Sequence, residues 1–131
     1  MNTSQLEKAL KCDEVAGPSF RGVFACNLLP VHVSTFPASF VANTDTSDEK
    51  GEHWVAFYFD HDGNAEYFDS YGIPPLNDHL EHFFNNNGKN HKHNTVQLQG
   101  LNSTVCGQYC IAYIAKRARN EPMADNVNQF K

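Results

Sequence analysis

Residues 53–69 read HWVAFYFDHDGNAEYFD, and this stretch predicts a β-hairpin. The segment 53–59 is apolar and aromatic on both faces, which is typical of a strand buried in the middle of a sheet. The segment 60–64 contains Gly63, which can take the positive φ of a tight turn. Residues 65–69 then form the returning strand, so the hairpin supplies the centre of the expected sheet.

The two ends of this hairpin carry His53 and Asp69. The two positions are symmetric about residue 61, so simple pairing places them opposite each other, with Cβ atoms about 4.5–5.5 Å apart. A carboxylate at that distance would fix the imidazole tautomer and stabilise the imidazolium. The plainer alternatives are a core histidine and a strand-end turn cap, and a bulge at Gly63 would change the register.

The segment 105–119 carries apolar residues throughout and has no Gly or Pro after Gly107, which predicts a buried helix. Cys106 stands at its start, where backbone N–H groups and the helix dipole favour a thiolate. Gly107 has no Cβ and leaves room for a substrate backbone to approach the sulfur. The alternative for Cys106 is a buried, inert cysteine, which is the preferred interpretation for Cys110.

A thiolate that attacks an acyl group also needs donors for the developing oxyanion. The backbone N–H of Cys106 is one candidate, and a side-chain amide can be the other. Gln97, Gln99 and Gln108 are all suitable by residue type. Their spacing from the cysteine does not choose among them.

Outside the hairpin, hydrophobic spacing and turn residues predict further elements. Ser4 and Glu7 match a capping box at the start of a helix. The other predictions are a helix over about 4–15, an irregular stretch over 18–37, strands over 39–44 and 95–99, and a helix between Pro75 and Gly88. Strands and helices in this order indicate an α+β fold, with a small and mostly antiparallel sheet flanked by helices.

Composition bounds the class of protein. Residues 1–131 are expected to form a single domain, with the tail frayed over about 120–131. Hydrophobic residues make up 40% and charged residues 19%, which indicates a globular chain. The net charge of −5 argues against a dedicated nucleic-acid-binding protein, and the basic segments 89–93 and 116–119 are interpreted as solvated surface.

The sequence also bounds location and ligands. No apolar run reaches the roughly 20 residues of a transmembrane helix, and the N-terminus lacks the apolar core of a secretory signal, so we expect an intracellular protein that is not secreted. The four cysteines form no C-x-x-C pair and are expected to be free thiols. Neither His79 with His82 nor His91 with His93 has partners in a recognised zinc spacing, so no metal or other cofactor is expected.

Several motifs of the chain resemble those of the adenovirus endopeptidase (adenain) family and, more distantly, the ubiquitin-like-protein proteases of the same fold. The similar segments are 17–22 (GPSFRG), 40–44 (FVANT), 53–57 (HWVAF), 68–72 (FDSYG) and 99–107 (QGLNSTVCG). The family patterns for the last three are H-W-x-A-F, F-[DE]-x-[FY]-G and Q-G-x-N-S-x-x-C-G. Their order, with histidine before acid before cysteine, is the reverse of the order in papain-type enzymes, where the cysteine comes first.

The resemblance implies a role for each matching residue. Cys106 would be the nucleophile, His53 its base and Asp69 the residue that orients the base, while Gln99 is preferred over the other glutamines as the oxyanion donor. Trp54 would flank the substrate cleft. The implied fold is the adenain-like cysteine-proteinase fold, with the catalytic cysteine at the N-terminus of a central helix.

The implied activity is that of a cysteine endopeptidase that cleaves proteins at Gly-containing sites through a thioester acyl-enzyme. Precursor proteins of a DNA virus or a virus-derived mobile element would be its substrates, in the nucleus or cytoplasm of a host cell or in a virion. No cysteine lies in 70–98, so an activator linked by a disulfide, as in adenoviruses, is not expected. An activating peptide or nucleic acid stays open.

Four alternatives remain from the sequence. The first is an isopeptidase for ubiquitin-like modifiers, and the second is an inactive protein-binding module. An acetyltransferase that shares the order of the three residues is the third. The fourth is a metal-binding protein built on the seven histidines.

Overall fold

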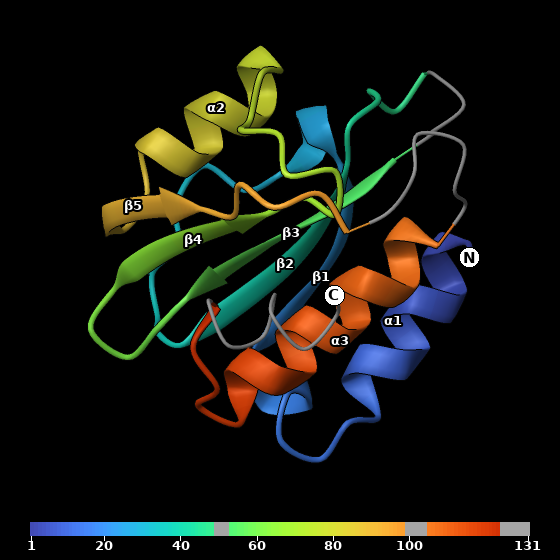
Figure 1. Ribbon diagram of the computed structural model, residues 1–131, viewed down its shortest axis with the longest axis vertical. Coiled ribbons are helices and arrows are strands. Elements are labelled where there is room, and N and C mark those ends of the chain that lie inside the picture. The colour runs from blue at the N-terminus through green and yellow to red at the C-terminus, as the bar shows by residue number, and fades with distance from the viewer. Residues whose placement is uncertain (49–52, 99–104, 124–131) are drawn as a thin grey trace.

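The computed structural model describes residues 1–48, 53–98 and 105–123, and its ribbon is shown in Figure 1. The helices and strands in chain order are α1 (Thr3–Lys11), β1 (Phe20–Ala25), β2 (Ala38–Asn43), β3 (Trp54–Phe59), β4 (Asn64–Phe68), α2 (Asp78–Asn85), β5 (Lys89–His93) and α3 (Cys106–Ala118). Short 3₁₀ turns at Gly17–Ser19 and Cys26–Leu28 flank β1.

The five strands form one sheet in the order β1-β2-β3-β4-β5. The inner pairings of β3 with β2 and β4 are antiparallel, whereas β1–β2 and β4–β5 are parallel. The expected α+β class is confirmed. The sheet is mixed rather than mostly antiparallel, because each outer strand is reached by a connection that crosses over instead of a hairpin.

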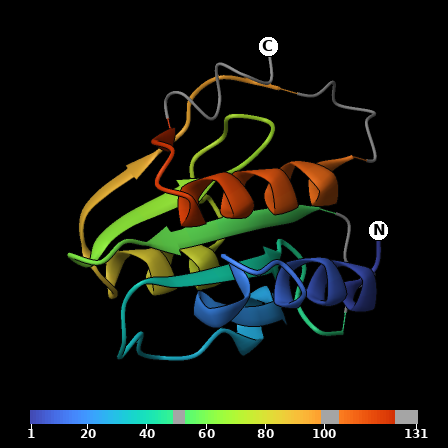
Figure 2. The ribbon, with the colours of Figure 1, turned by 90° about the horizontal axis from the view of Figure 1, so that it is seen from below.

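The helices cover both faces of the sheet, with α1 and α3 on one face and α2 on the other (Figures 1 and 2). Alternate residues of β3 face the two layers. Ala56 and Tyr58 pack with α1 and α3, whereas Phe57 and Phe59 pack with α2. This burial on both sides confirms the prediction of a central strand from its unbroken apolar sequence.

The hairpin between β3 and β4 differs in register from simple symmetric pairing. Ala56 pairs with Phe68 and Phe59 with Ala65, so the hairpin is centred on residue 62 rather than 61. Centring on residue 61 would pair Phe59 with Gly63 and would place this glycine outside a three-residue loop. The observed loop has three residues and includes Gly63 at φ +83°, the usual form of such a turn.

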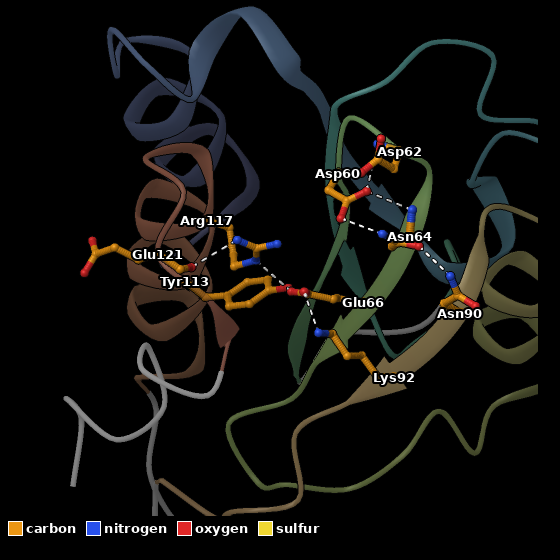
Figure 3. A network of polar contacts seen from close by, with 9 residues as sticks. All are labelled: Asp60, Asp62, Asn64, Glu66, Asn90, Lys92, Tyr113, Arg117 and Glu121. Carbon is orange, nitrogen blue, oxygen red and sulfur yellow. Dashed lines mark hydrogen bonds and ion pairs between the residues drawn. The ribbon is translucent and has the colours of Figure 1, made fainter.

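Asp60 stabilises this turn, as Figure 3 shows. Its Oδ1 accepts hydrogen bonds from the backbone N–H groups of Asp62 and Asn64 at 3.0 and 2.9 Å. Its Oδ2 accepts one from Asn64 Nδ2 at 3.0 Å. The register that positions the ends of the hairpin is therefore set by local contacts at its tip.

A buried ionic cluster ties α3 to β4 (Figure 3). Glu66 is 2% exposed and accepts hydrogen bonds from Tyr113 Oη at 2.6 Å and Arg117 Nε at 2.9 Å. Lys92 Nζ lies 3.7 Å from the other carboxylate oxygen, and the Arg117 guanidinium lies 4.6 Å from the centre of the Tyr58 ring. These contacts orient α3 along the sheet, and its N-terminus with it.

Three local predictions are wrong. The segment 18–37 contains β1, and residues 95–98 form no strand, whereas the polar segment Lys89–His93 does. The capping box that begins α1 joins Asn2 and Gln5, not Ser4 and Glu7.

The tail is packed as far as it is described. Met123 is 8% exposed and belongs to the core beneath α1 and α3. The carbonyl of Glu121 accepts a hydrogen bond from Arg117 Nη1 at 3.1 Å, and its N–H donates to Lys116 O at 3.0 Å. Residues 120–123 are thus packed against the rest of the protein, and residues 124–131 lie outside the described part of the chain, so the predicted fraying of the tail stays a prediction.

Candidate active site

The sheet brings the candidate residues to one end. His53 directly precedes β3 and Asp69 directly follows β4. Because these strands are antiparallel neighbours, the start of one meets the end of the other. The helix α3 begins with Cys106 at the same end, where the Trp54 N–H lies 3.5 Å from Cys106 Sγ. Three segments that are far apart in sequence thus converge.

His53 and Asp69 form a direct contact. His53 Nε2 lies 2.8 Å from Asp69 Oδ1, and the two side chains are only 13% and 6% exposed. The two residues are diagonal rather than opposite, because the register is centred one residue later than expected. This moves the residue opposite His53 from 69 to 71, and a shift of two keeps the carboxylate on the same face of the sheet.

The second ring nitrogen of His53 is directed to the thiol. Nδ1 is buried and makes no hydrogen bond to a nitrogen or oxygen atom of the described residues. With Nε2 engaged by Asp69, Nδ1 is the nitrogen left for Cys106, and the interaction of His53 with Cys106 alters the pKa of both groups. The ring therefore lies between a carboxylate and a sulfur.

This arrangement favours a thiolate–imidazolium pair. Burial alone would raise the pKa of Cys106, but hydrogen bonds from His53 and from the N–H groups of Trp54 and Gly107 lower it below its ordinary value. Burial alone would lower the pKa of His53, but Asp69 and Cys106 raise it to about 9. The His53 ring is therefore protonated near neutral pH, and the pKa of the Cys106 thiol is shifted toward the thiolate form.

Tyr71 is a contributor to the site that the strand pattern did not single out. Its ring stacks on His53, with centroids 4.4 Å apart and planes inclined by 18°. Its backbone N–H donates to Asp69 Oδ1 at 2.8 Å, on the same oxygen that His53 contacts. The signal was present in the segment FDSYG, and the corrected register would have placed residue 71 beside the histidine.

Gly72 completes this turn for a steric reason. Its φ is +72°, and a Cβ there would lie 2.8 Å from the Val96 carbonyl carbon and 2.9 Å from Thr95 O. Only glycine allows the segment after β5 to lie against the turn that carries Asp69 and Tyr71.

Trp54 and Gly107 both lie beside the sulfur. The Trp54 indole Nε1 donates to the Met1 carbonyl at 3.3 Å, and the residue is partly buried. A Cβ on Gly107 would lie 3.3 Å from Met1 Cβ and 3.4 Å from Leu6 Cδ2. The absent side chain of Gly107 thus lets α1 approach α3, and its role in admitting a substrate stays a prediction.

Gln99 lies outside the described residues. The residue before it, Leu98, is held close to the site, because its N–H donates to Ser70 O at 2.7 Å and its carbonyl accepts from Tyr109 Oη at 3.1 Å. Gln97 precedes this anchored position, and Gln108 is exposed on α3.

The other cysteines and histidines are placed differently. Cys12 is exposed, and Cys26 and Cys110 are buried, all as free thiols. Complete burial raises the pKa of the Cys110 thiol well above its ordinary value. Within 1–48, 53–98 and 105–123, no three metal-ligating side chains gather closely enough to hold an ion.

None of the described helices combines the length and the apolar character needed to span a bilayer.

The chain was compared with protein families, with curated proteins and with solved structures. No protein-family model matches the chain, and no curated protein matches it. A crystal structure of the ASFV pS273R protease is similar, with 29% sequence identity and a TM-score of 0.46 over 68% of this chain. The chain spans 38% of the length of that protein.

Proposed function

We propose that this protein is a cysteine endopeptidase in which Cys106 is the nucleophile, His53 the general acid and base, and Asp69 the residue that orients His53. One observation carries the proposal. The buried His53 ring contacts the Asp69 carboxylate through Nε2 at 2.8 Å and faces the Cys106 thiol through its other side. Burial by itself would raise the pKa of the Cys106 thiol, so its lowered pKa reflects the hydrogen bonds from His53 and from the neighbouring N–H groups.

In the proposed reaction, the Cys106 thiolate attacks the carbonyl carbon of a peptide bond. The tetrahedral oxyanion collapses, the C–N bond breaks, and the His53 imidazolium gives its proton to the leaving amine. A water molecule then attacks the thioester while His53 takes its proton. The products are a carboxylic acid and the free thiol, so no cofactor is consumed.

The helix N-terminus supplies part of the oxyanion site. The first N–H groups of α3 have no partner within the helix, and Cys106 is its first residue. Gln99 is proposed as the second donor because the family pattern carries its oxyanion glutamine there and because Leu98 is anchored beside Ser70. Losing such a donor costs about 10²–10³ in rate.

The proposed substrates are proteins cut at Gly-containing sites, among them viral precursor proteins, as the resemblance of the sequence implies. Trp54 is proposed to flank the cleft, since its N–H contacts the sulfur and its indole is fixed by Met1.

Incubation with a library of peptides, read by mass spectrometry, tests the proposal. The wild type is expected to cleave peptides at defined bonds, and Cys106→Ala to cleave none of them. The matched control is Cys110→Ala, which removes a thiol one helical turn further along α3 and should keep the cleavage pattern. Equal cleavage by wild type and Cys106→Ala would show that the bond is broken by another group, and no cleavage by either would favour a binding module.

A further inference from the structure

Asn94 is a buried polar residue with an unusual set of partners. It directly follows β5 and is 5% exposed. Its Oδ1 accepts a hydrogen bond from the Asp69 N–H at 2.9 Å, and its Nδ2 donates to the Asp69 carbonyl at 2.7 Å. The same Nδ2 lies 3.4 Å from Val96 O. One side chain therefore holds both main-chain polar groups of Asp69.

The position of Asn94 explains why a side chain takes this role. The parallel pairing of β4 and β5 ends with Tyr67 opposite His93, so no strand backbone continues alongside Asp69. The Asn94 amide replaces the missing strand for one residue. Buried backbone groups left without such a partner would carry a desolvation penalty.

The contacts lead directly to the reacting groups. The Asp69 main chain is fixed by Asn94 and by the Gly72 N–H, which donates to Asp69 O at 2.8 Å. Its Oδ1 then receives the Tyr71 N–H and His53 Nε2, both at 2.8 Å. A displacement of this backbone would move the carboxylate away from the histidine, because the short Asp side chain has little freedom to compensate.

We propose that Asn94 is a positioning residue of the active site, acting on His53 through the backbone of Asp69. This inference rests on the proposed function. The hydrogen bonds of the Asn94 side chain go to the backbone of Asp69 and Val96 and not to His53 or Cys106, so its effect is transmitted by Asp69. A misplacement of about 1 Å can cost about 100-fold in rate, and Asn94→Ala is expected to lower kcat by about 10- to 100-fold with little change in KM.

The chain offers a matched control in Asn87. It is also 5% exposed, and its amide also bonds backbone groups, accepting from Val33 N at 2.8 Å and donating to Val31 O at 3.1 Å and Phe83 O at 2.9 Å. These partners lie on the α2 side of the molecule, away from Cys106. Asn87→Ala should lower thermal stability as Asn94→Ala does, without changing the chemistry of the thiol.

The test is the rate of Cys106 alkylation by iodoacetamide as a function of pH, which needs no known substrate. Among the described residues, the titratable groups that face His53 are Asp69, Cys106 and Tyr71. In Asn94→Ala the weaker His53–Asp69 contact should move the acid limb of the profile upward by about one pH unit. Asn87→Ala should leave the limb in place.

Repeating the measurement in an Asp69→Ala protein separates a positioning role of Asn94 from general destabilisation. If Asn94 acts through the Asp69 carboxylate, Asn94→Ala should change the profile of wild type but not that of Asp69→Ala. If Asn94→Ala does not fold, the smaller change Asn94→Ser is measured in the same way. The inference is overturned if a folded Asn94 variant keeps the acid limb of the wild-type profile. It is also overturned if Asn94→Ala shifts this limb equally in wild type and in Asp69→Ala.

Failure of the proposed function gives a different result. In that case wild-type Cys106 itself alkylates no faster than an ordinary thiol, whatever residue stands at position 94. That outcome overturns both proposals. If the wild-type thiol is reactive but substitution of Asn94 leaves its alkylation profile unchanged, only the positioning role is overturned.

Discussion

Replacing Asp69 with asparagine should lower the pKa of His53 by a measurable amount. The wild-type pKa is raised to about 9 from an ordinary value of 6.5, although burial alone would lower it. That difference corresponds to about 3 kcal/mol of preference for the protonated ring. An adjacent carboxylate typically accounts for about 1–3 pH units, and the contact here is direct at 2.8 Å. We therefore expect the midpoint of the His53 titration to fall by about 1–3 pH units in Asp69→Asn.

The same change has a predicted effect on stability with a defined sign. Because the folded-state pKa of His53 lies above its unfolded value, the stabilisation is complete below about pH 6.5 and is lost as pH rises through about 9. Asp69→Asn should therefore lower the free energy of unfolding most at pH 6, by up to about 3 kcal/mol, and less at pH 9.5.

Proton NMR titration of the His53 ring and chemical denaturation at the two pH values provide the assays. Asp62→Asn is the matched control, since it removes one carboxylate from an exposed position of the same hairpin. A wild-type midpoint near 6.5, or a midpoint that Asp69→Asn leaves unchanged, would refute the reasoning.

Two further predictions concern residues around the site. Tyr71→Ala should remove the stacking on the His53 ring, worth about 0.5–2 kcal/mol, and should lower kcat/KM by about 2- to 30-fold. Tyr71→Phe keeps a ring at this position and should stay close to wild type. The kinetics of peptide cleavage measure both variants, and an equal loss of kcat/KM in the two would argue against stacking. Glu66→Ala should lower the free energy of unfolding by about 3–5 kcal/mol, because it leaves Arg117 buried without its carboxylate. Denaturation with urea measures this free energy, and a decrease of less than about 1 kcal/mol would contradict the prediction.

The centre of the fold could be predicted because its signals are local. The apolar run before Asp60 and the glycine in the turn predict the hairpin, and both strands are observed at these positions. The register could not be obtained from symmetry alone. It depends on the three-residue loop that Asp60 and Gly63 close, and that loop places Tyr71 rather than Asp69 opposite His53.

The edge strands of the sheet, β1 and β5, are harder to predict from the sequence than the central hairpin. The segment Lys89–His93 is polar and almost fully exposed, so no apolar alternation marks it as β5; its backbone pairing with β4 makes it a strand. In the same way β1 lies in a stretch with Gly22 at φ +137°, and it is held by its parallel pairing with β2. Such strands depend on tertiary contacts that no local pattern records.

Some residues at the site could be predicted from the sequence, whereas others depend on tertiary contacts. Histidine, aspartate and cysteine could be proposed from residue type and motif, since each brings its own chemistry. Asn94 could not, because an asparagine has many uses and this one depends on where β5 ends beside Asp69. The placement of a supporting residue follows from the assembled sheet.

The most direct measurement compares the alkylation rates of Cys106 and Cys12 in the native protein at pH 7, by mass spectrometry of the labelled peptides. Cys12 is exposed and Cys106 is only 6% exposed, so access alone favours Cys12. An activated thiolate at Cys106 should reverse this order and react about tenfold faster or more. Labelling of Cys12 first, with Cys106 protected until the protein is denatured, would contradict the proposed nucleophile.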